Sequence, residues 1–215
     1  MNLPPSVLML SARTSVRSSI RRGALMLLAA TALTSLWGCS AMTAQNPSSA
    51  LKPVNAIKEG DARLMLFGHD VVAYFTQGKH ALGQPQISSV YEDVTFRFAS
   101  AEHKALFDAN PQKYIPQYGG FCADGLVYGI PWGGDADVWR IYNGKLYIFG
   151  GVASLDAFLL DVPRNLVLAD KYWKEEVAGS NSFVQRSWRL MNRVPHYKSG
   201  EELAKMVAAA KAGKG

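Results

Sequence analysis

The pair Asn143-Gly144, which lies between two strand-like segments, restricts the fold of this sequence more than any other feature. The flanking residues, 138–142 and 145–149, are rich in β-branched and aromatic side chains, which favour strands. Asn and Gly tolerate the positive φ angles that a two-residue type I′ turn requires. The pattern therefore predicts a β-hairpin over residues 138–149.

The remaining patterns separate strands from helices along the chain. The apolar run 71–75 predicts a short buried strand, and the alternation at 94–98 predicts a half-buried strand whose hairpin partner contains Tyr91. Ser100 is a good N-cap for the next helix, and Ser199-Gly200-Glu201-Glu202 is a capping box for the last one. Helices are predicted at residues 101–109, 111–114, 155–160, 163–177 and 200–212. Segregated strands and helices predict an α+β fold of short antiparallel strands and hairpins with packed helices, followed by C-terminal helices.

The N-terminus has the composition of an export signal. Residues 1–39 contain four arginines and no acidic residue, and an apolar run occupies residues 24–37. This layout is typical of a secretory signal peptide, and the run is shorter than the roughly 20 residues that span a bilayer. The sequence Leu36-Trp37-Gly38-Cys39-Ser40 resembles the lipobox of bacterial lipoproteins. That resemblance implies lipid attachment, such as palmitate, at Cys39 and an outer-membrane protein facing the periplasm. The alternative is ordinary cleavage that yields a soluble periplasmic protein.

Charge and composition divide the rest of the chain. Residues 40–56 are small, polar and proline-containing, which predicts a flexible tether, and residues 57–179 carry the dense patterning of a domain. The formal charge of +6 separates into +4 for residues 1–39, −3 for 40–179 and +5 for the helical extension 180–215. An anionic or protein partner is therefore expected only for residues 180–215. An exported protein meets little nucleic acid, so no nucleic-acid partner is expected.

Four phrases of the sequence resemble those of the bacterial YHS domain-containing proteins. They are residues 66–75, residues 96–103 with Phe107, Asn110-Pro111 and Tyr114, residues 118–123, and Trp139 with residues 143–147. His69 and Val71 depart from the usual Tyr and Pro of the first phrase. The resemblance implies a small YHS-like domain. It also implies a possible metal-binding function, because the smaller YHS modules of metal-handling proteins are proposed to bind metal through cysteines.

The candidate ligands for such a metal are Cys122, His103 and His69. The family's cysteine positions correspond here to Ala73, Ala99 and His103, so few of the parent ligands remain. A structural zinc site needs four protein ligands, whereas a thiolate with imidazoles suits copper or zinc in general. The alternatives stay open: Cys122 is either a small buried apolar residue or a redox thiol, and His103 is either a core or cap residue or a ligand.

These observations predict an envelope-anchored module that binds a small ligand or a metal without catalysing a reaction. No phosphate-binding loop, nucleophile elbow or zinc-protease helix motif is present in the sequence, and no catalytic residue is predicted. One alternative is a thiol-dependent redox protein that uses Cys122. Another is a structural adaptor that acts through residues 180–215.

Overall fold

The computed structural model describes residues 56–59 and 62–213, which belong to one compact unit, Ser40–Gly215. The predicted signal peptide, Cys39 and nearly all of the predicted tether lie outside the described residues. Among the described residues, no helix is long and apolar enough to cross a membrane. The described chain has the predicted α+β class.

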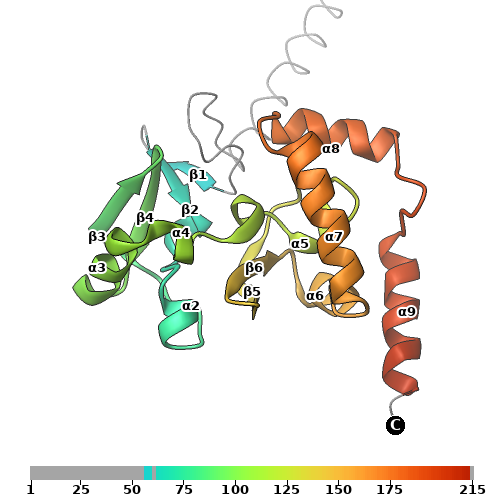
Figure 1. The fold of residues 1–215 in the computed structure, drawn as a ribbon, viewed down its shortest axis with the longest axis horizontal. Helices are drawn as coiled ribbons and strands as arrows, with labels where there is room; N and C mark the ends of the chain where they lie inside the picture. Colours follow the sequence, from blue (N-terminus) through green and yellow to red (C-terminus); the bar gives the residue numbers. More distant parts are fainter. Residues whose placement is uncertain (1–55, 60–61, 214–215) are drawn as a thin grey trace, which may run out of the picture. The chain divides into compact units, whose positions relative to one another are not determined.

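The first part of the fold is a four-stranded mixed sheet (Figure 1). Its strands are β1 (Ala56–Glu59), β2 (Ala62–Met65), β3 (Gln84–Tyr91) and β4 (Val94–Phe98). The order is β1-β2-β4-β3, in which β2 and β4 are parallel and the other pairs antiparallel. The strand predicted at 94–98 is confirmed, and Tyr91 ends its hairpin partner as expected.

The predicted hairpin is confirmed as β5 (Asp135–Tyr142) and β6 (Lys145–Phe149). Asn143 and Gly144 have φ angles of 50° and 71°, as a type I′ turn requires. β5 begins three residues before the predicted segment, beyond a register irregularity between Asp135 and Trp139.

The strand predicted at residues 71–75 is wrong. Residues 73–76 form the short helix α2 (Ala73–Thr76) instead, so His69 precedes a helix and not a strand. Asp70 is the cause, because its Oδ1 accepts hydrogen bonds from the N–H groups of Val72 and Ala73 and starts a helical turn. A short apolar run does not by itself distinguish a strand from a buried helical turn.

The helices predicted at residues 101–109, 111–114 and 200–212 are confirmed, whereas the one predicted at 155–160 lies at 152–158. The described chain also contains η2 (Leu66–Gly68), α3 (Ala101–Ala109), α4 (Pro111–Tyr114), η3 (Gln117–Gly120), α5 (Ala123–Leu126), α6 (Val152–Phe158), α7 (Val162–Tyr172), η4 (Trp173–Val177), α8 (Ser182–Met191) and α9 (Gly200–Ala212). Ser100 caps α3, and a capping box begins α9, as predicted. The predicted helix 163–177 is divided, because a π-helical segment follows α7 at Trp173.

Strand β6 lies between two hydrophobic cores. Leu146 and Ile148 belong to a first core with the four-stranded sheet and α3, whereas Tyr147 and Phe149 belong to a second core with α5, α6 and α7. Successive side chains of a strand point to opposite faces, so one strand contributes to both cores. The second core is the one that surrounds Cys122.

The C-terminal extension packs on this second part of the molecule. Helix α8 contacts η4, where Arg189 pairs with Glu176, and α9 contacts α6, where Lys211 pairs with Asp156. The apolar side chains of α8 divide between two environments. Phe183 is half-buried, whereas Val184, Trp188 and Met191 are exposed.

Candidate functional site

The segment from Gly119 to Cys122 determines where Cys122 lies. Gly119 and Gly120 have φ angles of 61° and 80°, which glycine adopts without strain, and they turn the chain into α5. The Cys122 N–H donates to the Trp132 carbonyl at 2.9 Å, and Cys122 forms an isolated bridge with Ile148 of β6. The Cys122 side chain is therefore held in the second core.

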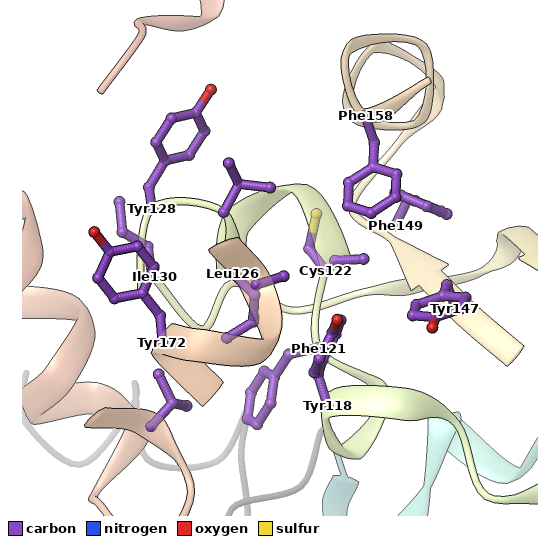
Figure 2. Packing of buried hydrophobic residues seen from close by; sticks show 14 of the residues in the cluster. Tyr118, Phe121, Cys122, Leu126, Tyr128, Ile130, Tyr147, Phe149, Phe158 and Tyr172 are labelled. Carbon is purple, nitrogen blue, oxygen red and sulfur yellow. The ribbon is translucent and has the colours of Figure 1, made fainter. Parts of the chain in front are cut away.

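Cys122 lies among aromatic and aliphatic side chains of that core, including Phe149 and Phe158 (Figure 2). It is 2% exposed, and burial raises the pKa of its thiol. The backbone of Gly125 and Gly150 and the side chain of Ser154 act to lower this pKa, but burial outweighs them. A nucleophilic or redox-active cysteine needs a lowered pKa and access to solvent, so this environment favours the interpretation of Cys122 as a buried apolar residue.

His103 is part of a buried hydrogen-bonded cluster in the first part of the fold. Its Nδ1 lies 2.6 Å from Asp70 Oδ2, and its Nε2 lies 3.0 Å from the hydroxyl of Thr76. A carboxylate only accepts hydrogen bonds, so Nδ1 is the donor in the first of these. With both ring nitrogens engaged, His103 has the core role that the sequence left as an alternative to metal ligation.

The three candidate metal ligands do not come together. The Nδ1 of His69 pairs with the Leu66 carbonyl at 2.9 Å, and its ring contacts His80, which is exposed. Asp70 accepts backbone N–H groups in a turn and orients His103 as well. In the part of the chain that the structure describes, no group of three or more His, Cys, Asp or Glu side chains is placed to hold a metal ion.

Asp124, a residue that the sequence did not single out, lines three cavities. Cavities of about 540, 310 and 60 Å³ are all lined by both Asp124 and Leu203. The largest, called here the large cavity, is also lined by Cys122 and Ser154. The signal in the sequence was one acidic residue in the otherwise uncharged segment 114–134.

Asp124 is a carboxylate in an apolar setting. It lies in the first turn of α5 and is 7% exposed, yet within residues 62–213 its side chain makes no hydrogen bond and no ion pair. Burial alone raises its pKa to about 7. Burial raises the pKa of Tyr128, another residue of the large cavity, and the charge of Asp124 adds to this effect. At neutral pH this carboxyl can therefore accept or release a proton, or bind a cation.

The remaining wall of the large cavity combines aromatic and cationic side chains. Trp132, 41% exposed, and Tyr197 belong to it, as do Arg186 and Lys198. The guanidinium of Arg186 lies over the Trp132 ring, 5.3 Å from its centre. Trp132 therefore lies at a cavity wall and not in either hydrophobic core.

Comparison of the chain with family models, with curated proteins and with solved structures gives no match.

Proposed function

We propose that this protein is an envelope lipoprotein of the YHS domain-containing kind that binds a small organic molecule, without catalysis, in the large cavity. The buried Asp124 carboxylate, which has no partner in the described chain and lines the cavity, carries this proposal. A cavity of about 540 Å³ lies within the 300–1,000 Å³ that is usual for small-molecule sites. Such sites are mostly apolar and contain a few polar groups that orient the ligand.

The structure gives less support to the metal-binding and redox versions of the function. His103 is held by Asp70 and Thr76, and Cys122 is a buried thiol with a raised pKa. A soft metal would have to be bound by the thiolate, which burial disfavours. Binding of a small ligand in the large cavity requires no rearrangement of these side chains.

Filling the cavity tests the ligand-binding proposal. We expect Leu203→Trp, which adds volume at the residue shared by all three cavities, to abolish binding of small molecules to the chain. Binding is measured as the rise in melting temperature with a set of neutral, cationic, anionic and zwitterionic fragments. A ligand present at 100 times its Kd stabilises the folded state by about 2.7 kcal/mol, which such a measurement detects.

The matched control is Ala209→Trp, which places the same side chain at an exposed position of α9 that lines none of these cavities. It should bind every fragment as the unchanged chain does. The proposal fails if no fragment binds the unchanged chain, or if Leu203→Trp binds as well as Ala209→Trp.

The envelope location rests on the resemblance of residues 36–40 to a lipobox. Metabolic labelling of producing cells with a fatty-acid analogue should label the unchanged chain, and Cys39→Ala should lose the label completely. Two or more acyl chains hold a protein on a membrane far more firmly than one, so the variant should also move to the soluble fraction. Equal labelling of the two proteins would contradict lipid attachment at Cys39.

A further inference from the structure

The large cavity is lined by two carboxylates and two cations that make no ion pair with a described residue, namely the buried Asp124, the exposed Asp135, Arg186 and Lys198. Asp124 is 7% exposed as a residue, and its carboxylate lines the cavity and makes no ion pair within residues 62–213. Arg186 and Lys198 are half-buried in the same wall and make no ion pair with any described residue. Other basic residues of the same extension are paired, Arg189 with Glu176 and Lys211 with Asp156.

Given that the cavity binds a small molecule, as proposed above, we infer that its ligand is a small zwitterion such as an α-amino acid. The ligand's ammonium group binds Asp124, and its carboxylate binds Arg186 and Lys198. The inference rests on the four charged side chains of one cavity, two of each sign, which make no ion pair in the described chain. Lys198 interacts with Glu202 only through a longer-range electrostatic contact.

The charged side chains of the cavity disfavour ligands that carry only a positive or only a negative charge. A buried carboxylate is costly without a partner, and an ammonium group supplies both the opposite charge and hydrogen-bond donors. An anionic ligand that lacks the ammonium group would be repelled by the negative charge of Asp124. An amine that lacks the carboxylate would be repelled by Arg186 and Lys198 and would leave both cations unpaired. The planar guanidinium of Arg186, already oriented by stacking on Trp132, suits a carboxylate.

The uncharged wall accommodates a side chain on the ligand. Tyr128, Trp132 and Tyr197 contribute aromatic surface, and Ile130 and Leu203 contribute aliphatic surface. A cavity of about 540 Å³ has room for a molecule of amino-acid size. We therefore expect amino acids with apolar or aromatic side chains to bind better than those with charged side chains.

The experiment measures binding of each of the twenty protein amino acids to residues 40–215 at pH 8, where Asp124 is mostly ionised. For each amino acid that raises the melting temperature, its amine lacking the carboxylate and its acid lacking the ammonium are titrated by calorimetry. We expect both analogues to bind at least about tenfold more weakly than the amino acid, because each loses a hydrogen-bonded charge.

Single substitutions assign the charges. Asp124→Asn and Lys198→Met should each weaken binding of the amino acid by about 10- to 100-fold. Asp124→Asn should not weaken binding of the acid analogue, which has no ammonium. Asp137→Asn is the matched control, because Asp137 is an exposed carboxylate that does not line the cavity, and it should change the Kd by less than about twofold.

The inference and the proposed function fail in different ways. If fragments of any charge bind to the unchanged chain and Leu203→Trp prevents their binding, the proposed function is supported. The zwitterion inference is overturned if none of the twenty amino acids binds, if the analogues bind as tightly, or if Asp124→Asn binds the amino acid unchanged. The absence of binding by any fragment overturns both.

Discussion

Replacing Asp124 by Asn should stabilise the unliganded protein at pH 8 by roughly 4 kcal/mol and should have little effect near pH 4. The pKa of this carboxyl is about 7 in the folded protein, against an ordinary value of 3.8. Between these two values the folded chain binds a proton that the unfolded chain has released. The contribution of Asp124 to the stability of the unchanged protein therefore falls as pH rises from about 4 to 7, by about 1.4 kcal/mol per pH unit, and is constant above pH 7. Asparagine does not titrate and avoids this loss.

The measurement is urea denaturation of both proteins at several pH values between 4 and 9. Asp137→Asn is again the control, since an exposed carboxylate should give a stability curve parallel to that of the unchanged protein. A difference between the Asp124→Asn variant and the unchanged chain that does not vary with pH would show that Asp124 is ionised normally. It would also remove the reason for treating Asp124 as an uncompensated charge.

A residue that lowers stability at neutral pH requires an explanation outside folding. Most of the second core is apolar, and an amide or apolar side chain at position 124 would avoid the cost of the buried charge. Binding residues are a common place for such a cost, because the same group that destabilises the free protein gains a partner in the complex. The expected pH dependence and the proposed ligand site are therefore two consequences of one carboxylate.

The elements predicted correctly from sequence are those whose signals are local. The hairpin at Asn143-Gly144 needs only two positive φ angles, and the cap at Ser100 needs only the N–H of His103, three residues away. The capping box at Ser199 is similarly contained within four residues. Each of these signals is complete within its own segment, and no distant contact overrides it.

The parts that the sequence did not predict depend on distant partners. Asp70 meets His103 from 33 residues away, and this contact fixes both the turn at residue 70 and the role of the histidine. Asp124 lines its cavities together with Leu203 of α9, almost eighty residues later in the chain. Neither the burial of Asp124 nor its lack of a partner can be recognised from its own sequence segment. The sequence therefore indicated Cys122 and the histidines as ligand-binding residues, whereas the structure indicates Asp124.

Replacing Asp70 by Ala should destabilise the protein by about 3–5 kcal/mol. Asp70 is fully buried and accepts four hydrogen bonds. They come from Val72 N at 2.8 Å, Ala73 N at 3.3 Å, Ala99 N at 2.8 Å and His103 Nδ1 at 2.6 Å. The alanine variant leaves these donors without an acceptor in a site that excludes water, which costs far more than an exposed contact. The free energy of unfolding is measured by urea denaturation at pH 7.

Asp108→Ala is the control, because Asp108 is an exposed carboxylate that accepts hydrogen bonds from Ser89 and Lys104. Exposed pairs of this kind contribute about 0–1 kcal/mol, so the control should lose no more than that. Asp70→Asn keeps one oxygen acceptor but turns an amide NH₂ toward the remaining donors, and it should fall between the two. If Asp70→Ala is as stable as Asp108→Ala, the hydrogen bonds among Asp70, His103 and Thr76 do not hold α2 against α3. The turn at residue 70 is then maintained by its apolar neighbours alone.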